Sequence, residues 1–259
     1  MTQQSATDPG GNGVRLVVGG NRGIGLALVA AQLADPAVRQ VIATSRAGSD
    51  PRGLEPLAAR YGERLRRLEL DVTDTRSLAA FEHSLRAIPG GIDLAIHAAG
   101  LLHDGPLQPE KTALDSRADH LLRLFAVNSV GPLLVARALL SALGRGRRFT
   151  FAALSAMVGS IGDNRLGGWY GYRASKAALN QFIRTLAIEC RVNYPRATVL
   201  AIHPGTTDTA LSRPFQRNVD PEKLYVPAQS AARILEVAAS AAGRHSGSFL
   251  NWDGREIPW

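Results

Sequence analysis

The sequence predicts an α/β fold in which a doubly wound parallel sheet carries helices on both faces. Short apolar runs alternate with longer segments of helical periodicity along nearly all of the 259 residues. Such runs are expected of strands buried on both faces, and strands that alternate with helices form parallel βαβ units. The first strand also passes into the first helix through a glycine-rich turn, which is typical of these units.

Four strands and two helices are predicted in the first part of the chain. The strands are 14–18, 40–44, 66–70 and 94–97, and the helices are about 24–33 and 75–87. The second strand stops at Ser45 and Arg46, and the third stops at Asp71. The run Ala98-Ala99-Gly100 breaks the fourth strand. A polar stretch with Gly and Pro between the second and third strands predicts a loop.

The later part of the chain continues the same alternation. The predicted strands are 149–154, 197–202 and 248–251, and the predicted helices are about 118–142, 172–192 and 228–242. Residues 101–117 are expected to form a loop. Residues 206–227 contain three Pro and few periodic apolar positions, so they predict a loop or lid over a site.

Composition is typical of one globular domain, which we place at 14–259 after a flexible polar tail at 1–13. Hydrophobic residues make up 45% of the chain and charged residues 20%. The tail has neither a basic start nor an apolar run, and we find no stretch of about 18 apolar residues, so neither a signal peptide nor a spanning helix is expected. Cys190 is the only cysteine, which excludes an intrachain disulfide. A cytoplasmic location is expected.

Positive charge raises the question of nucleic-acid binding, because the net charge is +8. The basic residues are scattered, and the densest group is Arg145, Arg147 and Arg148. No basic stripe with interleaved aromatic residues accompanies them, so we expect neither nucleic acid nor a membrane as a partner. No His has metal-ligand spacing, and no metal site is predicted.

The strongest local signal is the segment VRLVVGGNRGIGLAL, in which Gly19, Gly23 and Gly25 follow a strand and open a helix. Such glycines let the backbone approach a pyrophosphate, whose charge the free N–H groups of a helix N-terminus favour. A glycine pattern alone can mark a tight turn. The strand-turn-helix context at the start of the domain favours dinucleotide binding.

The end of the second strand indicates which nicotinamide cofactor is used. An acidic residue there would accept the ribose 2′-hydroxyl of NAD, whereas an arginine suits a 2′-phosphate. This strand runs into Ser45 and Arg46 without an acid, and Arg22 lies within the glycine turn. Two guanidinium groups can chelate a phosphate, so we predict NADPH rather than NAD. Two ordinary surface arginines are the alternative.

A second informative segment, WYGYRASKAALN, contains Tyr172 and Lys176 four residues apart on a predicted helix. This spacing places both side chains on one face. We expect the ammonium group of Lys176 to lower the pKa of the Tyr172 phenol, so that the phenol can exchange a proton near neutral pH. Such a pair is commonly only a surface contact. Its position between the glycine turn and the Pro204-Gly205 turn favours a catalytic role.

Taken together, these motifs resemble the short-chain dehydrogenase/reductase family along nearly the whole chain, which implies a Rossmann-type fold. The glycine spacing G-x-x-x-G-x-G and the Tyr-x-x-x-Lys pair carry the resemblance. The segment GSIGDNRLGGWYGYRASKAALN and the ending NWDGREIPW are similar to the C-factor-like subgroup. Val18 departs from the family's usual Thr, and His97 departs from its usual Asn.

The resemblance implies roles for individual residues. Tyr172 would protonate a substrate carbonyl oxygen, Lys176 would hold the nicotinamide ribose, and Asn128 would anchor a water molecule. Asp71-Val72 resembles the adenine-contacting pair, and the backbone of Thr207 and the hydroxyl of Thr209 resemble contacts to the nicotinamide carboxamide. The full set of expected cofactor contacts is Gly19, Asn21, Arg22, Gly23, Ile24, Gly25, Ser45, Arg46, Asp71, Val72, Ala98, Ala99, Gly100, Tyr172, Lys176, Pro204, Gly205, Thr207 and Thr209.

One departure affects the expected chemistry. The family places a carbonyl-polarising Ser three residues before the Gly of its Ser-Ser-x-x-Gly segment, and the aligned residue here is Ala156. In a regular strand the neighbouring Ser155 would face the other side. A kink at the strand end could aim Ser155 inward, so we predict that Ser155 supplies the hydroxyl, with Ser160 as a more distant candidate.

The predicted function is NADPH-dependent reduction of a ketone or aldehyde by hydride transfer, with a small carbonyl compound or alcohol as substrate. The alternative is a nucleotide-binding sensor or signalling protein that has lost efficient chemistry, which Ala156 favours. An extended sugar epimerase fits poorly, because the chain after Thr209 is short. The resemblance also implies a homo-oligomer, dimer or tetramer, joined through the helices that carry Asn128 and Tyr172.

Overall fold

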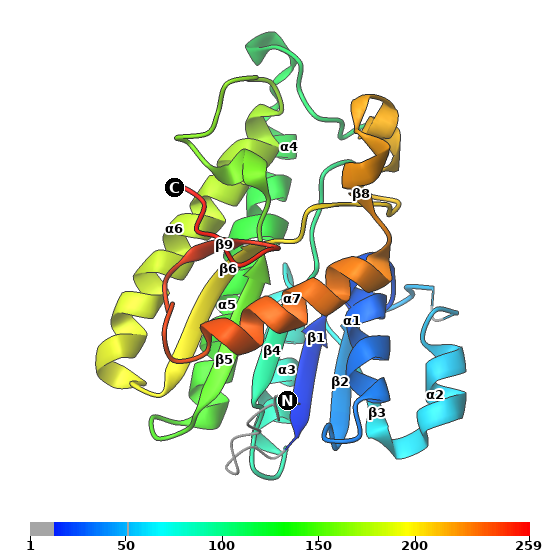
Figure 1. The fold of residues 1–259 in the computed structure, drawn as a ribbon, viewed down its shortest axis with the longest axis vertical. Helices are drawn as coiled ribbons and strands as arrows, with labels where there is room; N and C mark the ends of the chain where they lie inside the picture. Colours follow the sequence, from blue (N-terminus) through cyan, green and yellow to red (C-terminus); the bar gives the residue numbers. More distant parts are fainter. Residues whose placement is uncertain (1–12, 51) are drawn as a thin grey trace, which may run out of the picture.

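The structure of the chain, a computed structural model, describes residues 13–50 and 52–259. Its centre is a seven-stranded sheet in the order β3-β2-β1-β4-β5-β6-β9, and every pair of neighbours is parallel (Figure 1). The strands are β1 (Val14–Val18), β2 (Gln40–Ser45), β3 (Leu65–Glu69), β4 (Leu94–His97), β5 (Phe149–Leu154), β6 (Ala197–His203) and β9 (Phe249–Asn251). The two short strands β7 (Thr206–Thr207) and β8 (Leu224–Tyr225) pair separately.

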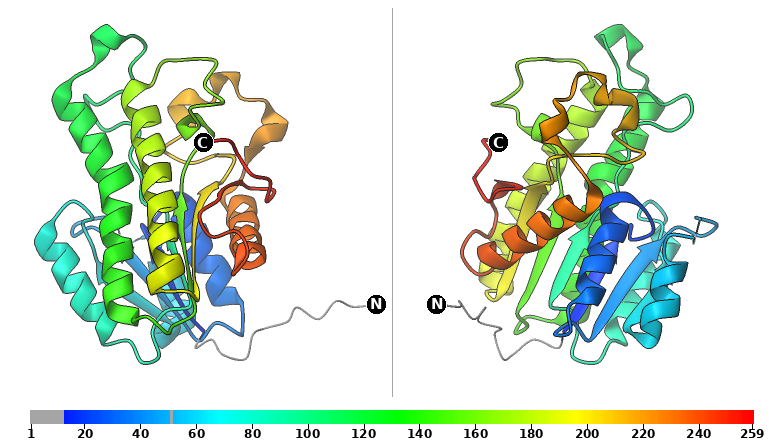
Figure 2. Two further views of the ribbon diagram at one scale, coloured as in Figure 1. Left: turned by 90° about the vertical axis from the view of Figure 1, so that its left-hand side faces the viewer. Right: turned by 45° about the vertical axis from the view of Figure 1, so that its right-hand side comes forward.

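Helices cover both faces of the sheet (Figure 2). One face packs against α1 (Gly23–Ala34), α2 (Glu55–Tyr61) and α7 (Pro227–Ala241), and the other against α3 (Thr75–Arg86), α5 (Gly131–Leu143) and α6 (Tyr170–Asn193). Each face therefore has its own apolar core, because the side chains of a strand alternate between the two layers. Along β6, for example, Val199 and Ala201 enter one core, whereas Leu200 and Ile202 enter the other.

The predicted doubly wound parallel sheet is confirmed, with each strand close to its predicted position. The predicted helix 118–142 is one continuous helical run, but it consists of α4 (Ala118–Phe125), a π-helical turn (Ala126–Val130) and α5. The prediction missed α2, none of whose residues is fully buried. A helix with so little buried surface leaves a weak apolar period in the sequence.

The predicted lid at 206–227 contains more structure than a plain loop. It begins with β7, continues through two 3-10 helices (Arg213–Asn218 and Pro221–Lys223), and ends with β8. The pairing of Thr206 with Leu224 and of Thr207 with Tyr225 closes the segment at its base. The lid is thus held at both ends, above the sheet (Figure 1).

Two further expectations concern the ends of the domain and membrane spans. Residues 1–12 of the predicted tail lie outside the described residues, and the carbonyl of Gly13 accepts backbone hydrogen bonds from Arg39 and Gln40. Gly13 thus belongs to the folded part rather than to the tail.

The run Ala118–Leu143 is long and apolar enough to cross a membrane by length and composition, contrary to our sequence-based expectation. More than half of its most apolar window is buried inside the protein.

The chain places β2 and β3 on one side of β1 and β4 and the later strands of this sheet on the other, so the topological switch point lies beside β1. In open parallel sheets, the crevice at the carboxyl ends of such strands is the usual place for a ligand. The glycine turn after β1, the loop after β4, the segment after β5 and the lid after β6 all leave the sheet at this edge. The predicted site residues are therefore brought to one end of the sheet by the topology.

Candidate active site

The glycine turn after β1 has the shape that a pyrophosphate requires. Gly19 has φ of 80°, and a Cβ atom there would lie 2.8 Å from the backbone nitrogen of Ala99. A Cβ at Gly25 would lie 2.0 Å from the Gly19 carbonyl oxygen. No side chain caps the N-terminus of α1, and its first turn contains no acidic residue. Its first N–H groups are therefore free to bind an anion, so the turn fits a dinucleotide.

A pocket of about 680 Å³ lies beside the ends of β2 and β3. Arg46, Asp71 and Arg76 are among its lining residues. Asp71 is fixed by hydrogen bonds from the backbone N–H and the hydroxyl of Thr73, and these bonds lower the pKa of its carboxyl group. The pocket lies where the adenosine end of the cofactor is expected. Arg76, at the start of α3, is a basic residue that the sequence analysis did not assign to it.

The opposite end of the crevice contains the Pro204-Gly205 turn. The hydroxyl of Thr207 lies 2.7 Å from that of Ser230 on α7, and it is buried. Thr209 packs against the glycine turn, because a Cβ at Gly23 would lie 3.2 Å from its methyl carbon. The structure therefore brings Thr209 and the glycine turn together, whereas the Thr207 side chain is directed into the protein.

Asn128 lies in the π-helical turn and is completely buried. Its carboxamide oxygen accepts a hydrogen bond from the backbone N–H of Leu101 at 2.8 Å, and its amide nitrogen donates to the Leu101 carbonyl at 2.7 Å. The same nitrogen lies 3.1 Å from the hydroxyl of Ser175 on α6. Asn128 thus joins the loop after β4 to α6 at Ser175, which lies between the two residues of the predicted catalytic pair.

Tyr172 and Lys176 lie together in the first turns of α6, and both are buried. The Nζ atom of Lys176 lies 5.8 Å from the centre of the Tyr172 ring and donates a hydrogen bond to the Leu154 carbonyl at 2.8 Å. Burial lowers the pKa of Lys176 to about 8. The spacing argument therefore placed the two groups correctly on one face of the helix.

The expected effect of Lys176 on Tyr172 is wrong for this structure. Burial raises the pKa of the Tyr172 phenol above its ordinary value of 10.0. The Lys176 ammonium group is turned toward a backbone carbonyl, and burial lowers its own pKa. Desolvation of the phenolate is the larger effect, so the phenol is held in its protonated form. The phenol thus has the proton that a donor requires, and its raised pKa makes it a weaker acid than a free phenol.

The assignment of Ser155 as the carbonyl-polarising group is not supported by its position. Its hydroxyl is buried and donates a hydrogen bond to the side-chain oxygen of Asn180 at 2.7 Å. Ala156, by contrast, packs in the cluster that contains Tyr172. No kink reverses the strand alternation, so Ser155 faces α6 and the position beside Tyr172 has no hydroxyl. Ser160 is also engaged, because its hydroxyl donates to the Pro258 carbonyl.

Aromatic side chains surround Tyr172. The ring of Trp169 lies 6.2 Å from that of Tyr172 and 5.0 Å from that of Phe215 in the lid. Phe215 in turn lies 5.7 Å from His103 in the loop after β4. Sequence analysis did not bring these three rings together, because residues so far apart in the chain are joined only by the fold.

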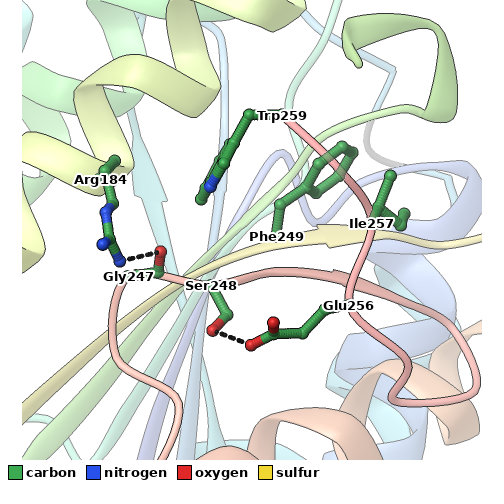
Figure 3. Close-up of a pocket in the computed structure, with 7 residues that line it drawn as sticks. All are labelled: Arg184, Gly247, Ser248, Phe249, Glu256, Ile257 and Trp259. Carbon is green, nitrogen blue, oxygen red and sulfur yellow. Dashed lines mark hydrogen bonds between the residues drawn. The ribbon is translucent and has the colours of Figure 1, made fainter. Parts of the chain in front are cut away.

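A second pocket, of about 180 Å³, lies beside β9 and the C-terminal segment (Figure 3). Arg184 donates to the Gly247 carbonyl there, and Ser248 donates to Glu256. None of the predicted catalytic or cofactor residues lines this pocket. Within the described part of the chain, no group of three or more His, Cys, Asp or Glu could hold a metal ion.

Comparisons with known proteins identify the family of the chain. The sequence model of a family described as enoyl-(acyl carrier protein) reductase matches residues 18–243. An uncharacterized oxidoreductase of Schizosaccharomyces pombe is 28% identical over 258 residues, which cover 96% of this chain and 98% of that protein. The C-signal protein of Myxococcus xanthus is 34% identical over 141 residues, covering 54% of this chain and 78% of that protein.

A solved structure matches the fold as a whole. The NADPH-bound carbonyl reductase from chicken fatty liver superimposes with a TM-score of 0.83 at 29% identity. The match covers 95% of this chain and 94% of that one. The resemblance noted from the motifs, including that to the C-factor-like subgroup, is thereby confirmed.

His97, at the end of β4, replaces the family's usual Asn and is buried. Its Nε2 atom has no hydrogen-bond partner among the described residues. Burial, and then the nearby charge of Lys176, lower the pKa of His97 to about 3 from the ordinary 6.5. The imidazole is therefore neutral in the folded protein at every pH at which the site could operate.

The burial of His97 predicts that the folded protein is less stable in acid. Between about pH 6.5 and pH 3 the unfolded chain binds a proton at residue 97 that the folded protein does not, so the free energy of unfolding falls as the pH falls. The slope is up to about 1.4 kcal/mol per pH unit. We expect His97→Asn to lose less stability than the wild type between pH 6.5 and pH 4 in denaturant titrations. Equal slopes for the two proteins would contradict this account.

Proposed function

The chain belongs to the short-chain dehydrogenase/reductase family, and from this premise we propose that it is an NADPH-dependent reductase of ketones or aldehydes. The observation that carries the proposal is the position of Tyr172 and Lys176, which lie side by side, buried, at the crevice shared by the glycine turn and the lid. Reduction of a carbonyl group to an alcohol needs a proton donor beside the cofactor, and the protonated phenol of Tyr172 fits that role.

In the proposed reduction, the glycine turn after β1 would hold NADPH, and the bound cofactor would supply a hydride for the carbonyl carbon of the substrate. Tyr172 donates its phenolic proton to the carbonyl oxygen, so that an alcohol forms. Lys176 lies one helical turn away, where its ammonium group would hold the nicotinamide ribose, and a proton from water restores the phenol of Tyr172. Asn128 holds the Leu101 backbone and Ser175, and thereby fixes the distance between the loop after β4 and α6.

Preference for NADPH over NADH is supported by the charges at the adenosine end. Arg22 and Arg46 are exposed, and neither forms an ion pair with any residue in 13–50 or 52–259. Arg46 and Arg76 line the same pocket. Free guanidinium groups at this place favour a 2′-phosphate, which can accept two parallel hydrogen bonds from each.

The cofactor proposal is tested by titrating the intrinsic fluorescence with NADPH and with NADH. We expect NADPH to bind more tightly, and Arg46→Ala to weaken NADPH binding by about 10- to 100-fold, because one charged contact to the phosphate is lost. NADH binding should change little. Arg191→Ala, which removes an exposed arginine of α6 far from the pocket, is the matched control. Equal affinity for the two cofactors would contradict the proposal.

Catalysis by Tyr172 is tested in the same preparations with a panel of ketones and aldehydes. Tyr172→Phe should retain NADPH binding and lower turnover by at least about 10²-fold, since the proton donor is removed.

Because Ala156 leaves the carbonyl oxygen with one donor, Ala156→Ser should raise turnover, by up to about 10²–10³-fold. Ser155→Ala should lower turnover much less than Tyr172→Phe does. Full activity of Tyr172→Phe would refute the mechanism.

A second candidate is a cofactor-binding sensor or signalling protein with weak catalysis. Ala156 and the engagement of Ser155 with Asn180 favour it, because the site has lost one of its expected donors. Retention of Asn128, Tyr172 and Lys176 in one connected site favours the enzyme. Tight NADPH binding without turnover of any carbonyl compound would make the sensor the better account.

We also propose that the protein is a cytoplasmic homo-oligomer, joined through the helices that carry Asn128 and Tyr172. Leu122 of α4 is 71% exposed and Val192 of α6 is 79% exposed, and Val130 and Ile188 are partly exposed. Burial of such side chains between subunits stabilises an association.

Sedimentation velocity should show a dimer or tetramer for the wild type, and Leu122→Arg should weaken this association. Ile161→Arg, a change at another exposed apolar residue, should leave it intact. A wild-type monomer would contradict the proposal.

A further inference from the structure

Trp169, immediately before α6, has an unusual backbone conformation. Its φ is 53° and its ψ is 42°, and it is the one non-glycine residue with positive φ among residues 13–50 and 52–259. A left-handed conformation strains a bulky side chain, so it persists only where the surroundings determine it. Such outliers occur often in functional sites, which makes the surroundings of Trp169 informative.

Glu110, which lies in the loop after β4, stabilises this conformation of Trp169. Its backbone carbonyl accepts a hydrogen bond from the Trp169 N–H at 2.6 Å, and its buried carboxylate accepts one from the Gly171 N–H at 3.1 Å. The carboxylate also lies at the N-terminus of α6, where the helix dipole favours negative charge. On the other side, Arg173 donates to the carbonyls of Gly167 and Gly168.

The result of this conformation is the position of the indole ring. It packs edge-on against Tyr172 on one side and against Phe215 of the lid on the other. The remaining members of this cluster are apolar, and they include Leu101, Ala156 and Leu211. A substrate that presents its carbonyl group to Tyr172 must place the rest of its surface against this wall. The wall can contribute apolar and aromatic contacts to it.

We propose that Trp169 is the specificity-determining residue of the site, selecting carbonyl compounds with a flat aromatic group, and that Glu110 is the residue that positions it. This inference rests on the proposed reductase function. The aromatic group of the substrate packs against the indole and Phe215 while its carbonyl oxygen meets the phenol of Tyr172. Edge-to-face contacts between rings favour such a group over an aliphatic chain of similar size.

The test compares an aryl compound with an aliphatic one of the same carbon number, both in turnover and in binding. Turnover is measured with NADPH and either benzaldehyde or heptanal, and binding is measured calorimetrically with the NADP⁺-loaded protein and either benzyl alcohol or 1-heptanol. The wild type should prefer the aryl member of each pair. Trp169→Ala should lower the aryl preference by about 10- to 100-fold, and Trp169→Phe should retain part of it. Tyr170→Ala, at the exposed neighbouring residue, should retain all of it.

The role of Glu110 is tested by the preference for the aryl over the aliphatic compound rather than by activity alone. Glu110→Ala should reduce the aryl preference while NADPH affinity stays unchanged, and Glu110→Gln, which keeps an acceptor for the Gly171 N–H, should restore it. A loss of stability with an unchanged aryl preference would reduce Glu110 to a structural residue and overturn its proposed role. A wild type without aryl preference in the binding measurement would overturn the role of Trp169. Failure to bind NADPH would instead refute the proposed function.

Discussion

A single buried amide, the side chain of Asn128, ties together three segments that are far apart in the sequence. It pairs with both backbone polar groups of Leu101 and with the hydroxyl of Ser175. An amide buried without partners would cost about 1–3 kcal/mol for each unpaired group, so these segments are held in the one arrangement that satisfies it. The neighbouring Ser129 adds a hydrogen bond to the Ser175 carbonyl. The places of Tyr172 and Lys176 on α6, relative to the sheet and to the glycine turn, follow from this connection.

Local patterns were enough to predict the strands, most helices and the residues that form the crevice, because each depends on apolar period, on glycine or on a four-residue spacing. The features that escaped prediction depend on tertiary contacts. The π-helical turn places Asn128 in the interior, yet its residues could equally extend an ordinary helix. The direction of the Ser155 side chain is fixed by its hydrogen bond to Asn180 of α6, and the raised pKa of Tyr172 results from its burial in the cluster that also contains Ala156. The left-handed conformation of Trp169 depends on Glu110, which is distant in the sequence.

The chemistry of the site is shaped by what burial does to each group. The phenol of Tyr172 is kept protonated, the amine of Lys176 has a pKa near 8, and His97 is kept neutral. Ala156 leaves an apolar surface where the family has a hydroxyl, and aromatic rings cover the same side. A substrate carbonyl would therefore meet one proton donor in apolar surroundings. Binding energy from the aromatic wall could offset the missing donor by holding the substrate in place.

The most direct test of the central claim is the transfer of isotope from cofactor to product. NADPH deuterated at C4 of the nicotinamide, prepared separately in each of the two configurations, is incubated with the protein and an aryl aldehyde, and the alcohol is analysed by mass spectrometry. The account predicts that one of the two cofactors delivers deuterium to the carbinol carbon, and that Tyr172→Phe suppresses the labelled product. If the protein binds NADPH tightly but neither cofactor labels any alcohol, the claim that this site transfers a hydride is wrong.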